Sequence, residues 1–180
     1  MADTKMEIRS AHGQVTKTIT ALDRIMNANV GDLRPLYEGF GAEVKTLQNA
    51  ANAARSRAQA TQAKSQDYFT TWAQEIETIR DPAIKGQSLK RLGAAKTSYR
   101  TVEQSLFQTR DAYAPMMSSL SDIQTAFGQD LTRSGVTAIR PAYGKARQQA
   151  IALQGMMKNS MSAIDAAAKE LTSRASGAPL

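Results

Sequence analysis

The fold of this chain is decided by residues 40–82, which read FGAEVKTLQNAANAARSRAQATQAKSQDYFTTWAQEIETIRDP. One row of apolar or small side chains recurs there every seven residues, at Phe40, Leu47, Ala54, Thr61 and Tyr68. A seven-residue repeat is typical of helices that pack side by side at a shallow angle. The stretch ends at Asp81-Pro82, a pair that favours the N-cap and first residue of a new helix. It therefore predicts one long helix that turns directly into another.

The same repeat continues in three further segments on either side of this stretch. Together the segments predict four helices, over about residues 4–28, 33–80, 82–131 and 136–172. Short turns between helices make consecutive helices antiparallel. We therefore expect an all-α fold: an elongated antiparallel four-helix up-and-down bundle, formed by a single domain at residues 1–172. Residues 173–180 lack the repeat, and we expect them to form a disordered tail.

The unequal lengths of the four segments predict a projecting end. At a rise of about 1.5 Å per residue, the two central helices would each reach roughly 70 Å, against roughly 40 Å for the first and 55 Å for the last. The repeat pairs Tyr68 with Tyr99 across the central hairpin, and the outer helices stop opposite Ala54 and Tyr99. The central coiled-coil hairpin should therefore project as a two-helix section, here called the hairpin tip, built from residues 68–99.

The composition lacks the residues that most catalytic and metal sites require. The 180 residues include no Cys and a single His, which is His12. Without Cys there are no disulfides or zinc–cysteine sites, and His12 lacks the Glu three residues before it that a di-metal bundle would use. Neither a glycine-rich phosphate loop nor a Ser–His pair is recognisable. We expect a protein that is not an enzyme, holds no metal or cofactor, and has no transmembrane segment, because no apolar run reaches 18 residues.

Charge is concentrated at the hairpin tip. The chain has 23 Lys and Arg against 16 Asp and Glu, a net charge of +7, and residues 80–100 contain six basic residues and one acidic residue. Aromatic side chains precede this basic run, on a section where only two helices are available to bury them. The candidate contact surface consists of Phe69, Trp72, Arg80, Lys85, Lys90, Arg91 and Lys96.

Three interpretations of this surface stand side by side. In the first, the aromatic residues anchor an anionic surface or an acidic partner that the cations attract. In the second, the aromatic rings fill the seam between the two helices and the lysines only keep the tip soluble. In the third, the tip binds nucleic acid, although no recognition module is present and specific binding is not expected.

A set of scattered positions resembles a known family. They are Phe69, Trp72 and Glu75, then Ser88, Arg91 and Tyr99, and then Ala114-Pro115-Met116, Asp122 and Leu131. On these residues, between about 33 and 165, the chain resembles a bacterial family described only as a domain of unknown function. Its members are helical coiled-coil proteins, typically exported and lipoprotein-like. The resemblance implies no known activity or cofactor, and it implies the periplasm or cell envelope as the location.

The expected function is therefore a non-enzymatic structural or interaction module, which contacts an unknown protein or an anionic component of the bacterial cell envelope through the basic hairpin tip. The alternative is a coiled-coil scaffold in the cytoplasm or a phage particle. Such a scaffold would form a homo-oligomer through exposed heptad positions.

Overall fold

The computed structural model describes residues 1–29 and 31–175, and these residues form five helices and no strand. The helices are α1 (Ala2–Met26), α2 (Arg34–Glu77), α3 (Pro82–Gln129), α4 (Arg133–Ala138) and α5 (Arg140–Ala175). The prediction of an all-α chain is confirmed. The predicted helix ends lie within about three residues of the observed ends for α1, α2 and α3.

The last predicted helix differs from the structure, because it is divided in two. The Thr132 hydroxyl accepts a hydrogen bond from the backbone N–H of Gly135 at 3.2 Å and so caps the short helix α4. Pro141 then follows the break at Ile139, and its missing N–H prevents one continuous helix from running through this point. Helix α5 continues to Ala175, into the predicted tail, and residues 176–180 lie outside the described residues.

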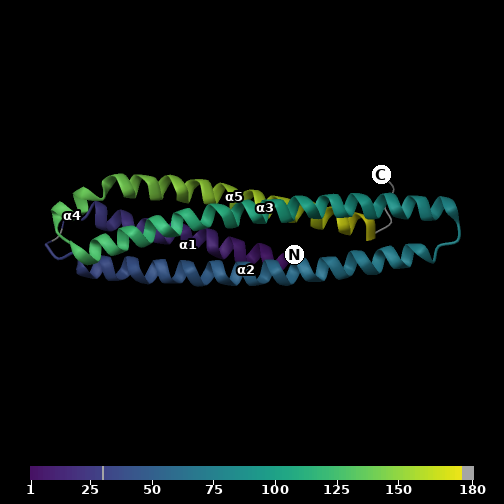
Figure 1. Ribbon diagram of the computed structural model, residues 1–180, viewed down its shortest axis with the longest axis horizontal. Helices are drawn as coiled ribbons and strands as arrows, with labels where there is room; N and C mark the ends of the chain where they lie inside the picture. The colour runs from purple at the N-terminus through teal and green to yellow at the C-terminus, as the bar shows by residue number, and fades with distance from the viewer. Residues whose placement is uncertain (30, 176–180) are drawn as a thin grey trace.

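The molecule is elongated, with the two longest helices running along its whole length (Figure 1). Helices α2 and α3 are joined at one end by residues 78–81, and α1 and α5 lie alongside them and stop short of that end (Figure 1). The opposite end, here called the base, holds the α1–α2 connection and the segment from Asp130 to Tyr143 with α4 (Figure 1). One end of the molecule is therefore thick and the other consists of the hairpin tip.

Contacts between helices show which positions face each other. The hydroxyls of Thr4 in α1 and Thr61 in α2 are 2.8 Å apart, and those of Thr109 in α3 and Ser160 in α5 are 2.9 Å apart. Between α2 and α3, the ring of Tyr99 packs on Phe69 with centroids 5.7 Å apart. The sequence predicts Tyr68 as the partner of Tyr99, and the observed partner is the next residue, Phe69, so the pairing is shifted by one residue.

Two separate clusters of buried side chains hold the helices together. The large cluster fills the space between all the helices from the base to the middle of the molecule, and its largest fully buried members include Phe40, Leu47, Leu120, Phe127 and Leu153. The small cluster lies in the hairpin tip and consists of Phe69, Ile76, Leu92, Ala95 and Tyr99. The tip thus has a core of its own, whose buried side chains come from α2 and α3.

Because His12 is partly buried, the stability of the protein is expected to depend on pH. Its side chain is half-buried with Nε2 unbonded, and burial, followed by the positive charge of Lys158, lowers the pKa of His12 below its ordinary 6.5. On acidification the unfolded chain therefore takes up this proton before the folded chain does, and stability falls as the pH drops through about 6.5. We expect the free energy of unfolding, measured with urea, to be lower at pH 5.5 than at pH 7.5. The His12→Gln variant should show a smaller difference between the two pH values. An unchanged difference in the variant would assign the effect to other groups.

Candidate contact surface at the hairpin tip

The turn between α2 and α3 is fixed by local bonds. The Asp81 carboxylate accepts hydrogen bonds from the backbone N–H groups of Ala83 at 2.8 Å and Ile84 at 3.0 Å, as an N-cap does. Across the turn, the Lys85 ammonium forms an ion pair with Glu77 at 2.8 Å. Lys85, a predicted contact residue, is therefore engaged by its own hairpin.

Phe69 lies inside the tip rather than on its surface. The sequence predicts it as a surface anchor, but its side chain is 8% exposed and packs edge-on against the Tyr99 ring. Burial raises the pKa of Tyr99 above its ordinary 10.0, and a hydrogen bond with Ser65 offsets part of that rise, so Tyr99 stays neutral in this apolar setting. For Phe69 the structure follows the second interpretation, in which the aromatic ring fills the seam.

Beside this core, one face of the tip is covered by no helix among residues 1–29 and 31–175 beyond the ends of α1 and α5. Met1 and Leu171 are the points at which these two helices touch the tip cluster. Along most of the molecule, one side of α2 packs on α1 and one side of α3 packs on α5. Between Met1 and Leu171 and the turn at residues 78–81, no other described helix lies over these two sides (Figure 1). We call this surface the inner face; it is formed by Tyr68, Trp72 and Glu75 of α2 and by Ser88 and Arg91 of α3.

The inner face is hollowed into a pocket of about 370 Å³. Its walls combine aromatic, charged and hydroxyl side chains: Tyr68, Thr71, Trp72, Glu75, Ser88, Arg91 and Leu171. The Tyr68 ring lies 5.8 Å from the Trp72 ring, and Tyr68 is 52% exposed. The structure therefore places an aromatic pair and the Arg91 guanidinium in one hollow.

The remaining predicted cations surround the tip without entering this pocket. Arg80 lies in the turn and Lys90 on α3, both exposed, whereas Lys96 is half-buried. Because adjacent residues of a helix point in different directions, Lys90 and Arg91 do not share a face. The candidate surface thus divides into the inner face, which holds Trp72 and Arg91, and an outer set of cations.

Three exposed apolar side chains at the tip were not among the predicted contact residues. Tyr68 belongs to a seven-residue row that was interpreted as core, Leu89 was interpreted as core beside such a row, and Ile84 stands at the start of α3, where it is 57% exposed. The available signal was helix length: a heptad position is buried only where another helix covers it. Applied to the region beyond α1 and α5, that rule would have found them.

Within the described residues, no group of three or more His, Cys, Asp or Glu side chains is placed to hold a metal ion. No described helix has the length and apolar character needed to cross a membrane. The tip therefore offers a surface for contact, with aromatic, basic and hydroxyl groups on it.

The fold and this surface define an elongated helical protein with a projecting two-helix tip. A family model described as "Protein of unknown function (DUF2959)" matches residues 1–171, so the chain belongs to that family. The match confirms the predicted resemblance to a family of unknown function. Comparison with curated proteins and with solved structures gives no match. Four residues that carried the resemblance, Trp72, Glu75, Ser88 and Arg91, line the pocket of the inner face.

Proposed function

We propose that the chain is a non-enzymatic structural and interaction module, an antiparallel four-helix up-and-down bundle that contacts an anionic surface or acidic partner through its hairpin tip. The observation that supports this most directly is the pocket in which Trp72 and Arg91 lie together, beside Leu171 near the described end of α5. We place the module at the bacterial cell envelope, as the family resemblance implies.

The chemistry of the tip favours an anionic partner. Trp, Tyr and Arg are the side chains that contribute most at contact surfaces, because each combines a large apolar area with a polar group. The exposed cations Arg80 and Lys90 add a long-range attraction, worth about 1 kcal/mol for each basic residue close to an anionic membrane. The carboxylates of Glu75, Glu77 and Asp81 reduce this attraction, and the charge of Glu77 is compensated by its ion pair with Lys85.

Co-sedimentation with phosphatidylglycerol vesicles and with cell-wall sacculi tests the proposal. The tip variant combines Arg80→Gln, Lys90→Gln and Arg91→Gln, and we expect it to bind at least about tenfold more weakly than the natural chain. Trp72 is the only tryptophan in the chain, so its fluorescence should shift to shorter wavelength on binding.

The matched control removes the same charge away from the tip, through Arg9→Gln, Arg55→Gln and Lys145→Gln, all of which are exposed. This control should bind within threefold of the natural chain, roughly the effect expected of distant surface charges. Equal losses in the two variants would show that only net charge matters, and the tip would then lose its assigned role.

A scaffold that self-associates is the second candidate function, and the exposed apolar side chains Tyr68, Ile84 and Leu89 favour it. Sedimentation equilibrium separates the two functions. A dimer that Ile84→Glu converts to a monomer, while Ile151→Glu on α5 does not, would assign the tip to contact between copies of this chain. A chain that stays monomeric at high concentration would exclude the scaffold.

A further inference from the structure

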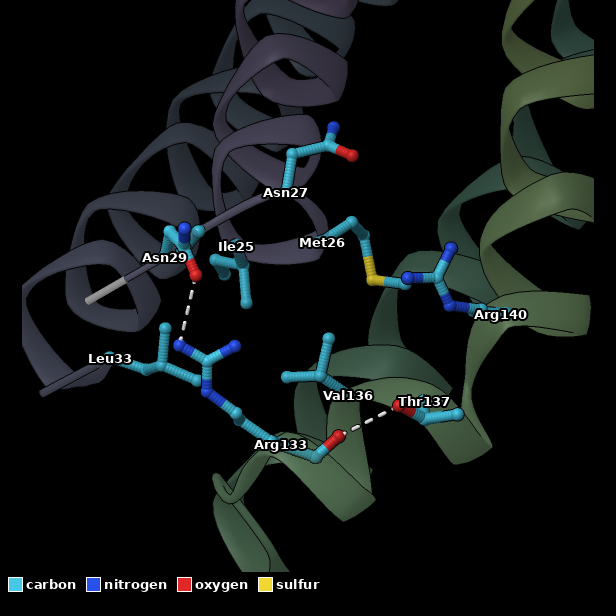
Figure 2. A pocket seen from close by; sticks show the side chains of 10 residues that line it. Ile25, Met26, Asn27, Asn29, Leu33, Arg133, Val136, Thr137 and Arg140 are labelled. Atoms are coloured by element: carbon cyan, nitrogen blue, oxygen red, sulfur yellow. Dashed lines mark hydrogen bonds between the residues drawn. The ribbon is translucent and has the colours of Figure 1, made fainter. Parts of the chain in front are cut away.

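A second pocket lies at the base, at the opposite end of the molecule from the tip. It has a volume of about 350 Å³ and lies between the end of α1, the start of α2 and the α4–α5 segment (Figure 2). This volume is at the lower end of the range for small-molecule sites, so the pocket has room for a small ligand.

The inner wall of this pocket is apolar. Ile25 and Met26 come from the end of α1, Leu33 precedes α2 and Val136 belongs to α4; all four side chains are buried (Figure 2). The break between α4 and α5 shapes this wall, because α4 ends before Ile139 and α5 sets off in its own direction from Arg140. Thr137, at the rim, donates a hydrogen bond to the Arg133 carbonyl at 2.9 Å, within the same short helix.

Two arginines stand at the mouth of the pocket, and Asn27, Asn29 and Thr137 add polar groups to its lining. Arg133 extends toward Asn29, whose side-chain oxygen accepts a hydrogen bond from it at 3.2 Å (Figure 2). Arg140 lies on the other side, directed toward Met26 (Figure 2). Neither guanidinium forms an ion pair with another described residue.

The carboxylates near the base have other partners. Asp23 accepts a hydrogen bond from the Tyr143 hydroxyl at 2.8 Å. Asp32 and Asp130 each accept from a backbone N–H group, at 2.9 Å from Arg34 and 3.0 Å from Thr132. The pocket thus places two positive groups above an apolar wall while the local acids are bonded elsewhere.

We propose that the base pocket binds a small amphipathic anion, in which a short alkyl chain ends in a carboxylate or phosphate. The alkyl chain would lie in the hollow against the small exposed parts of Leu33 and Val136, each 7% exposed, and the anionic group would lie near Arg133 and Arg140 at the mouth, since guanidinium donors match the geometry of carboxylate and phosphate oxygens. The site is independent of the tip, and its test does not depend on the tip's function.

Calorimetric titration of the full chain with four probes tests the chemistry. Octanoate supplies both features, octan-1-ol only the chain, inorganic phosphate only the charge, and octyltrimethylammonium a chain with the opposite charge. We expect octanoate to bind with one-to-one stoichiometry and the other three at least tenfold more weakly. Equal binding of octanol would reduce the site to an apolar hollow, and equal binding of phosphate would reduce it to a charge patch; either result overturns the proposal.

Substitutions at the pocket test whether octanoate binds there. Arg133→Gln combined with Arg140→Gln should weaken octanoate binding at least tenfold, and Thr137→Trp should weaken it by filling the pocket mouth without disturbing a buried residue. The control Arg24→Gln with Arg34→Gln removes the same charge from exposed positions at the same end and should leave binding unchanged. Equal losses in both arginine pairs would overturn the site.

A vesicle-binding measurement distinguishes a free amphiphile from a membrane lipid as the source of the anion. If the pocket takes a free amphiphile, the Arg133→Gln/Arg140→Gln variant should pellet with phosphatidylglycerol vesicles as the natural chain does. Loss of pelleting in that variant, with no octanoate binding to the natural chain, would show that the arginines serve a membrane contact and would overturn the proposal.

Discussion

Replacing Phe127 with alanine is expected to lower the free energy of unfolding by about 3–5 kcal/mol, the range for a buried phenylalanine whose removal leaves a cavity. Phe127 is 1% exposed and lies in the large core cluster near the base. Its ring meets the Tyr37 ring at 6.3 Å in an edge-on arrangement, so it joins α3 to α2. Because the ring is almost completely covered by its neighbours, its removal leaves a cavity. Urea unfolding followed by circular dichroism measures the loss.

Phe107→Ala is the matched control, because it removes the same atoms from the same helix. Phe107 is 49% exposed, and the Arg110 guanidinium lies over its ring at 5.1 Å. We expect this variant to lose less than about 1 kcal/mol, since an exposed cation–π contact and a half-exposed ring contribute little. Comparable losses at the two positions would mean that the base is packed no more tightly than the outer face of α3.

The fold was largely predictable, because helix formation in this chain follows a periodic pattern that a sequence displays directly. The seven-residue rows identified the long helices, and short turns such as Asp81-Pro82 gave their reversals. The rows state which side of a helix faces a neighbour, but they do not state how many neighbours are present. Leu106, which stands seven residues after Tyr99 in the repeat of the third segment, shows the difference: the repeat predicts a buried residue, and the structure leaves it only partly buried beside the core.

The break between α4 and α5 was missed for a different reason. Pro141 was visible, but a proline is accepted in the first turn of a helix, and the sequence alone did not show that the helix would restart at Arg140. The base pocket depends on that restart, and its walls come from three segments far apart in the chain. No local pattern marks such a site.

The tip was predicted as a basic two-helix projection, yet the aromatic residue expected on its surface, Phe69, is exchanged with its neighbour Tyr68. The structure buries Phe69 against Tyr99 and exposes Tyr68, the reverse of the predicted row. An α-helix has 3.6 residues per turn, so a strict repeat of seven drifts by about 20° per heptad in a straight helix. Over the length of α2 this drift is enough to exchange two adjacent residues between seam and surface.

A second large effect is expected at the tip, where Ile76→Ala should accelerate amide hydrogen exchange locally by roughly thirtyfold or more, since truncating a buried isoleucine costs about 2–5 kcal/mol. Ile76 is buried in the small tip cluster and contributes nothing to the large one. Exchange measured by mass spectrometry should rise for peptides within residues 68–95 and stay unchanged for peptides of α1 and of the first half of α5.

This separation follows from the arrangement of the two clusters. In the tip α2 and α3 pack mainly on each other, and Met1 and Leu171 are the points where α1 and α5 touch them, so the hydrogen bonds of the tip can open with little disturbance of the base, as cooperative subunits of a fold do. Leu153→Ala, in the large cluster, is the comparison, and it should instead accelerate exchange across α1, α3 and α5 together. If Ile76→Ala raises exchange evenly along the whole chain, the tip opens only when the molecule unfolds. The inner face would then be as rigid as the base, and a partner would have to bind it without any local opening of the tip.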